Sequence, residues 1–225
     1  MPKKPFTPAE IESQQNRIMD GAARVMAETG YHQLSMRTLA ARLEMTASNI
    51  YNYFPGKESL FLNIRRRGFE LAFRQVFTFA VGQADTRVLV QFVRQLVGFD
   101  QAYPGYYLLM FQSPALLPDE SAEDLGVLDQ QVQRLVTDWQ QQVQQMLTLV
   151  CPSLNECGVV YQQRVTLYFL ASVHGLISSY RYQSFPDVSA SELSDDVISD
   201  FVSRVISGLG QIGSAPVSAS YRQNA

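Results

Sequence analysis

The sequence predicts an all-α protein. Apolar residues recur every three or four positions along most of the 225 residues, which is the spacing of one helix face. Alternating β-branched segments of strand length do not occur, and proline or glycine separates the periodic segments. We expect a small N-terminal domain of three helices followed by a larger helical domain.

The first long helix is expected over residues 8–29. Gly30 suits its C-terminal cap, because glycine readily adopts the backbone conformation that ends a helix. Ser35 is a plausible cap for the next, short helix. The apolar stripe of the long helix consists of Ile11, Ile18, Ala22, Val25 and Met26.

Residues 36–60, which read MRTLAARLEMTASNIYNYFPGKESL, contain two short helical patterns joined by a tight turn. Leu39, Ala40 and Leu43 lie on one face of the first pattern. Thr46 is placed to cap the second through its side-chain oxygen. Two short helices joined in this way are typical of a helix-turn-helix, whose second helix enters the DNA major groove. The pattern therefore predicts DNA binding.

The rest of the chain is predicted to be helical as well. The expected helices span residues 57–81, 86–102, 105–112, 122–150, 158–183 and 191–209. Small and polar residues after residue 210 indicate a disordered tail. We therefore predict a helix-turn-helix domain over 1–56, a ligand-binding and dimerisation domain over 57–210, and a tail over 211–225.

Composition is that of a soluble globular protein, with 46% hydrophobic and 17% charged residues. No apolar run approaches the roughly 20 residues of a membrane span, and the polar N-terminus does not resemble a signal peptide. Cys151 and Cys157 are too few for a secreted disulfide scaffold, and we expect them to be unpaired loop thiols. The expected location is the cytoplasm, without a membrane partner.

Charge is unevenly distributed along the chain. Residues 1–75 contain 11 of the 18 Lys and Arg residues and 7 of the 21 Asp and Glu residues. The basic part coincides with the helix-turn-helix, as expected if this end of the chain meets phosphate.

No pattern of catalytic residues accompanies these helices. The sequence lacks a glycine-rich phosphate loop, a nucleophile elbow and a Ser or Cys nucleophile paired with His. His32 and His174 are the only histidines, so a metal site is not expected. We predict a protein that is not an enzyme and needs no cofactor. A helical adaptor that binds proteins rather than DNA is the alternative.

A group of short strings over roughly residues 10–65 carries a family resemblance. The strings are Arg17-Ile18, Ala22-Ala23, Gly30-Tyr31, Ser35-Met36-Arg37, Leu39-Ala40, Ile50-Tyr51-Asn52-Tyr53-Phe54 and Lys57-Glu58-Ser59-Leu60. In residue type and spacing they resemble the tetracycline-repressor (TetR) family of transcriptional regulators. The resemblance implies a homodimeric repressor that a small hydrophobic effector releases from a palindromic operator. Glu44 departs from it, since the family usually has a small residue or glycine in the turn.

The resemblance also implies a set of residues that contact DNA. Asn49 can make bidentate contact with adenine, and the helix N-terminus at Lys57 favours a phosphate. Two alternatives stay open. One is that Thr46 and Ser48 are only a capping and a solvent-exposed residue, and the other is that Tyr53 packs within the domain. The expected contacts are Thr46, Ala47, Ser48 and Asn49 in the groove, and Arg37, Tyr51, Tyr53 and Lys57 at the phosphates. The run Arg65-Arg66-Arg67 is expected to be a solvated helix face.

The aromatic residues of the middle helices are the candidates for contact with the effector. Aromatic residues at helical spacing more often form part of the core, however. The string Leu170–Leu176 looks like a His-Gly element found in one subgroup of the family. We expect a small, largely apolar effector that contacts Tyr107, Trp139 and His174, with a core role for His174 as the alternative.

Two late helices carry apolar stripes that suit a four-helix interface across a twofold axis. The expected interface residues are Val165, Phe169, Leu176, Val197, Phe201 and Val205. A buried monomer core is the alternative.

Overall fold

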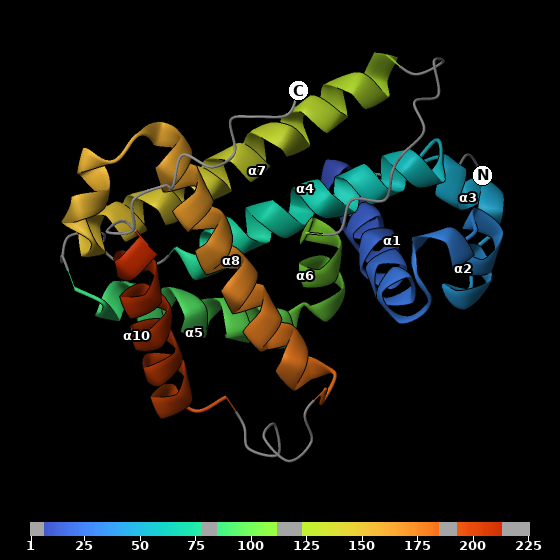
Figure 1. Cartoon of the computed structure of the whole chain (residues 1–225). Helices are drawn as coiled ribbons and strands as arrows, with labels where there is room; N and C mark the ends of the chain where they lie inside the picture. The colour runs from blue at the N-terminus through green and yellow to red at the C-terminus, as the bar shows by residue number, and fades with distance from the viewer. Residues whose placement is uncertain (1–6, 78–84, 112–122, 185–192, 213–225) are drawn as a thin grey trace, which may run out of the picture. The chain divides into compact units, whose positions relative to one another are not determined.

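In the computed structural model, residues 7–77, 85–111, 123–184 and 193–212 are described, and all of their regular structure is helical (Figure 1). This confirms the predicted all-α class. The α-helices are α1 (Pro8–Thr29), α2 (Met36–Arg42), α3 (Ala47–Tyr51), α4 (Lys57–Val76), α5 (Arg87–Ala102), α6 (Pro104–Phe111), α7 (Glu123–Val150), α8 (Val159–Arg181) and α10 (Asp195–Ile212). Two 3-10 helices, η1 (Tyr31–Gln33) and η2 (Pro152–Glu156), were not predicted. No helix in the described ranges is both long and apolar enough to cross a membrane.

Helix α1 begins and ends as its sequence indicates. Thr7 caps it in a box with Glu10, and Pro8 occupies the first turn, where a missing N–H costs nothing. Gly30 ends it at a φ of 87°, with its N–H bonded to the Met26 carbonyl. The expected apolar stripe is buried from Ile18 onward, whereas Ile11 at its beginning is 38% exposed.

The chain divides into two compact units, residues 1–78 with 98–139 and residues 79–97 with 140–225. The first unit therefore contains α6 in addition to the helix-turn-helix and α4. The tail over 211–225 lies almost entirely outside the described residues. The predicted boundary at residues 56 and 57 stays a prediction.

Within the first unit, α6 lies against both α1 and α4 (Figure 1). Glycine allows each close approach. A Cβ atom on Gly105 would lie 2.7 Å from the backbone carbonyl of Ala23 in α1, and one on Gly68 in α4 would lie 2.6 Å from the Met110 side chain.

Aromatic rings fill the core of the same unit beside α4. Trp139 is 1% exposed, and four phenylalanine rings meet it edge-on at centroid distances of 4.9–6.1 Å. These rings belong to Phe69, Phe73, Phe77 and Phe111. Edge-to-face packing of this kind stabilises a core by ring electrostatics as well as by burial.

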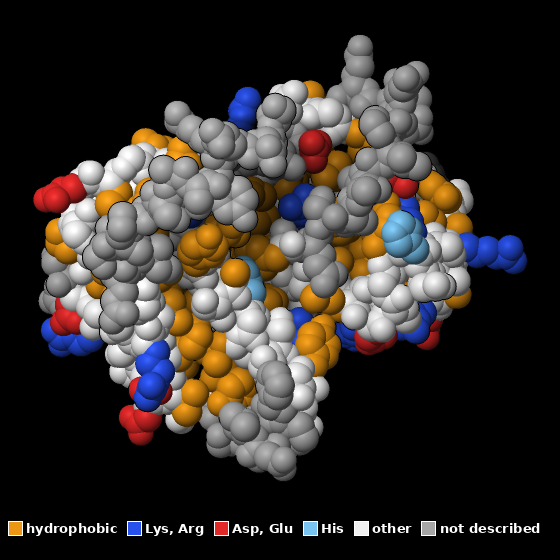
Figure 2. Space-filling model, viewed as in Figure 1, with side chains coloured by type: hydrophobic (Ala, Val, Ile, Leu, Met, Phe, Trp, Pro, Cys, Tyr) orange, Lys and Arg blue, Asp and Glu red, His pale blue; other side chains and the backbone are white. Residues whose placement is uncertain are grey.

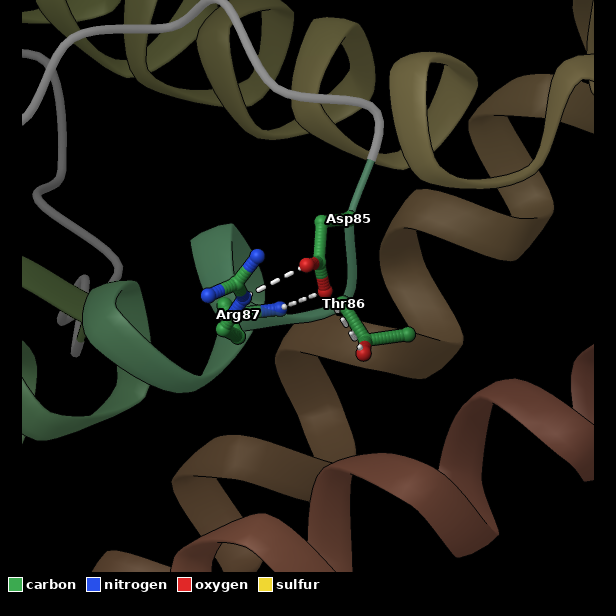
Figure 3. Close-up of polar contacts among 3 residues, drawn as sticks. All are labelled: Asp85, Thr86 and Arg87. Atoms are coloured by element: carbon green, nitrogen blue, oxygen red, sulfur yellow. Dashed lines mark hydrogen bonds and ion pairs between the residues drawn. The ribbon is translucent and has the colours of Figure 1, made fainter.

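In the second unit, polar contacts cap the start of α5. The carboxylate of Asp85 accepts the backbone N–H of Arg87 at 2.9 Å and the hydroxyl of Thr86 at 3.3 Å (Figure 3). The bond from the Arg87 backbone holds the pKa of Asp85 below its usual range. Helix α10 packs on α8, and Arg94 of α5 pairs with Asp195 of α10 at 2.7 Å.

Burial in this unit corrects part of the expected dimer interface. Val165 is 2% exposed and Phe169 is fully buried, with its ring 6.2 Å from that of Phe92. These two side chains fill the core of their own chain, which is the alternative that the sequence left open. They cannot also meet a partner subunit.

Candidate nucleic-acid interface

Helix α3 presents a polar outer face. Ile50 is fully buried and anchors the helix, while Ser48 and Asn49 are exposed and Ala47 is half-buried. Thr46 is exposed as well, and its hydroxyl oxygen accepts the backbone N–H of Asn49 at 3.2 Å, so the predicted cap is confirmed. The hydroxyl keeps its own hydrogen for donation.

The turn before α3 is held against α1. Arg17 donates a hydrogen bond of 2.8 Å to the carbonyl of Leu43, and Gly21 leaves room for the Leu43 side chain. Glu44 takes a φ of 54°, a left-handed conformation that glycine adopts most readily. Arg42 also pairs with Glu28 at 3.1 Å. The contacts of Arg17 and Gly21 with Leu43 therefore position the turn that precedes α3 relative to α1.

The expected phosphate-contacting residues surround this face. Arg37 in the first turn of α2 is exposed, and Tyr51 is 51% exposed. Tyr53 is half-buried after the end of α3, which leaves both of its predicted roles open. Lys57 is the first residue of α4, whose cap Gly56 provides no side-chain acceptor. Without a side-chain cap, the first amides of α4 are available to an anion.

The run of three arginines on α4 is only partly solvated. Arg65 is 5% exposed and donates to the Met110 carbonyl at 3.2 Å, and burial lowers its pKa. Arg66 donates to Asn63 of the same helix at 3.0 Å. Arg67 lies 3.8 Å from Asp20. The expectation of a solvated face is therefore wrong for Arg65, because its guanidinium satisfies a carbonyl near the end of α6.

The three expected effector contacts belong to different parts of the chain. Tyr107 and Trp139 are buried in the first unit at 4% and 1% exposure. His174 is half-buried on α8 in the second unit, and burial lowers its pKa to about 4. The neutral form of His174 is therefore favoured at neutral pH. Their contact with an effector stays a prediction.

A cavity of about 420 Å³ lies within the second unit, between η2, α8, α10 and the end of α7. Both cysteines line it, with Ser153, Glu156 and Tyr161 as its other polar residues. Its apolar walls are Leu147, Leu154, Val165, Ile206 and Leu209. Helical periodicity could not reveal this cavity, because it does not show that Ile206 and Leu209 of α10 close over residues 147–165.

The part of the chain that the structure describes holds no group of three or more His, Cys, Asp and Glu side chains arranged for a metal ion. The chemistry offered by α3 and its surroundings is hydrogen bonding and positive charge, which suits bases and phosphates.

Residues 18–64 match the sequence model of the family described as bacterial regulatory proteins, tetR family. Over 133 residues the chain is 21% identical to the HTH-type transcriptional regulator RutR of Escherichia coli K12 and of Shigella flexneri. This alignment covers 57% of the chain and 63% of the length of these relatives.

Solved structures show a similar fold. The structure of AibR in complex with isovaleryl coenzyme A and operator DNA has a TM-score of 0.61 at 20% identity, covering 88% of this chain and 97% of that one. The fatty acid degradation regulator FadR from Bacillus halodurans has a TM-score of 0.58 at 15% identity, covering 92% and 96%.

Proposed function

We propose that this chain, which belongs to the TetR family of transcriptional regulators, represses transcription as a homodimer that a small effector releases from operator DNA. The single observation that carries the proposal is the exposed, acid-free outer face of α3, with Asn49 at its start and Ile50 buried beneath it. The exposure of Arg37 and Tyr51 beside this face favours DNA binding over an adaptor role.

In the proposed complex, α3 lies in the major groove. Thr46, Ala47, Ser48 and Asn49 face the bases, and the amide of Asn49 reads adenine. Arg37, Tyr51, Tyr53 and Lys57 contact phosphates, which fix the position of the helix without reading sequence.

The proposed dimer uses the outer faces of α8 and α10. On α8, Tyr168 is 48% exposed, and hydrophobic side chains are visible over these two helices (Figure 2). Exposed apolar surface of this kind marks a protein interface. We keep four of the predicted residues, which are half-buried and so accessible to a partner: Leu176, Val197, Phe201 and Val205.

Sedimentation of the purified chain tests this interface. Leu176→Arg or Phe201→Arg would bury an unpaired charge between subunits and should give monomers. Val127→Arg, at a position 57% exposed on α7, is the matched control and should stay dimeric. A monomeric parent protein, or dimers of both interface variants, would remove this part of the proposal.

We propose the cavity of the second unit as an effector site in addition to the predicted contacts. Its volume and mainly apolar walls suit a small, largely apolar molecule with a polar group. Isovalerate, the acyl part of the isovaleryl coenzyme A in the AibR complex, is the first compound to test, because the whole coenzyme is too large and too highly charged for this cavity. If this compound is an effector, it must lower the affinity of the protein for the operator. The operator must then lower the affinity of the protein for the compound by the same factor. Equal affinity with and without operator would exclude this compound.

Selection from a pool of random duplexes tests the central function. A twofold dimer should enrich a pseudo-palindromic site whose half-sites lie about one or more helical turns apart. A pool that gains no shared sequence would contradict the proposal.

A further inference from the structure

The ammonium of Lys57 lies over the face of an aromatic ring. Its Nζ is 4.1 Å from the centroid of the Tyr31 ring and 3.4 Å from the carbonyl oxygen of His32. The negative face of a ring attracts a cation, and a carbonyl accepts one of the three N–H donors of an ammonium. Donors therefore remain for a phosphate oxygen at the start of α4.

The ring itself is fixed by the helix that carries the lysine. Tyr31 meets the fully buried Phe61 edge-on at 5.1 Å, and its hydroxyl donates to Glu58 Oε1 at 3.4 Å. Lys57, Glu58 and Phe61 all belong to the first turns of α4. The η1 segment and the start of α4 thus form one assembly around the Tyr31 ring.

A lysine side chain normally loses much rotamer freedom when it binds a single phosphate. A lysine that is already held in place loses less freedom on binding, which raises affinity. Burial lowers the pKa of Lys57, and the nearby charge of Glu58 raises it by a smaller amount. The net downward direction agrees with an ammonium that is partly removed from water.

We propose that Tyr31 is a positioning residue for DNA: its ring holds the Lys57 ammonium at the start of α4, and a DNA backbone phosphate binds the ammonium there. The inference rests on the proposed function, because it requires that the chain binds DNA. The competing explanation is that Tyr31 only packs on Phe61 and that Lys57 acts independently of it.

The test is a double-mutant cycle on the full-length protein, with the duplex enriched from the random pool as probe. Lys57→Met should weaken binding and reduce the slope of log affinity against log salt concentration by about 1. Tyr31→Leu should weaken binding about two- to tenfold. In the Lys57→Met background, Tyr31→Leu should cause no further loss. Tyr31→Phe, which retains the ring, should stay within about twofold of the parent.

An equal loss from Tyr31→Leu with and without Lys57 would overturn the inference, because the tyrosine would then act through the fold alone. Unfolding midpoints identify a variant that fails to fold, and Tyr31→Met then replaces Tyr31→Leu in the cycle. If the parent protein enriches no DNA, the proposed function fails. If the parent binds DNA but Lys57→Met binds equally well, only this inference fails.

Discussion

The hydroxyl of Tyr106 donates a hydrogen bond of 2.6 Å to the carboxylate of Asp20, and so joins α6 to α1 across 86 positions of sequence. Burial, aided by this bond, raises the pKa of Tyr106, so the hydroxyl is protonated and donates at neutral pH. The same carboxylate lies 3.8 Å from Arg67 of α4. Three helices of the first unit therefore meet around one charged group.

Tyr106→Phe removes this bond and should lower the free energy of unfolding by about 1 kcal/mol. The cost is moderate because the Asp20 side chain is 53% exposed and water can replace the lost donor. Urea unfolding at fixed protein concentration measures the change. Tyr103→Phe is the control, since its bond from Gln75 is long at 3.4 Å, and it should cost less. A larger loss in the control would contradict the assignment.

The two glycines beside α6 should differ in their response to substitution. Gly105→Ala places a methyl group against the rigid backbone of Ala23, whereas Gly68→Ala meets the flexible side chain of Met110. We expect Gly105→Ala to lower the free energy of unfolding by about 1–3 kcal/mol and Gly68→Ala to have a smaller effect. Gly98→Ala has open space and should not destabilise the fold. The reverse order of the first two variants would show that α6 is not held as described.

Glu44→Gly should stabilise the helix-turn-helix. A residue with a Cβ is strained at a φ of 54°, and glycine removes that strain, although it loses more backbone freedom on folding. The expected net gain in the free energy of unfolding is about 0.5–1 kcal/mol. Arg42→Gly in the preceding helix should instead be destabilising. A loss of stability in Glu44→Gly would show that the side chain contributes more than its backbone strain.

Local sequence patterns predicted the helices and their caps well. Ser35, Thr46 and Gly30 cap as expected, because capping depends on neighbouring residues alone. The burial of Arg65 and Phe169 could not be predicted in the same way. Each depends on a distant partner, the Met110 carbonyl for the arginine and the Phe92 ring for the phenylalanine.

For the DNA-contacting residues, the sequence predicted the exposed positions on α3 but not the ring beneath Lys57. Tyr31 lies 26 positions before Lys57 in the chain, in a 3-10 helix that the sequence did not predict. Periodicity shows which face of a helix is apolar, but it does not show which side chain from another segment meets that face.

His174 should make stability depend on pH. Its pKa is about 4 in the folded chain and 6.5 in the reference state, so between these values the unfolded chain binds a proton that the folded chain does not. The free energy of unfolding should therefore fall as the pH falls, by about 2 kcal/mol between pH 7.5 and pH 5. His174→Gln should lose this part of the pH dependence, and His32→Gln, at an exposed position, should retain it. Identical pH profiles for the parent and His174→Gln would contradict the burial of this imidazole.

Equilibrium binding of Asn49→Ala and Arg37→Ala to the enriched duplex and to a scrambled duplex, at one salt concentration, tests most directly whether α3 reads DNA. Asn49→Ala should lose about 1–3 kcal/mol of binding free energy on the enriched duplex and little on the scrambled one. Arg37→Ala should weaken both by a similar factor, because a phosphate contact carries no sequence information. If Asn49→Ala weakened both duplexes equally, α3 would not be the helix that reads the groove.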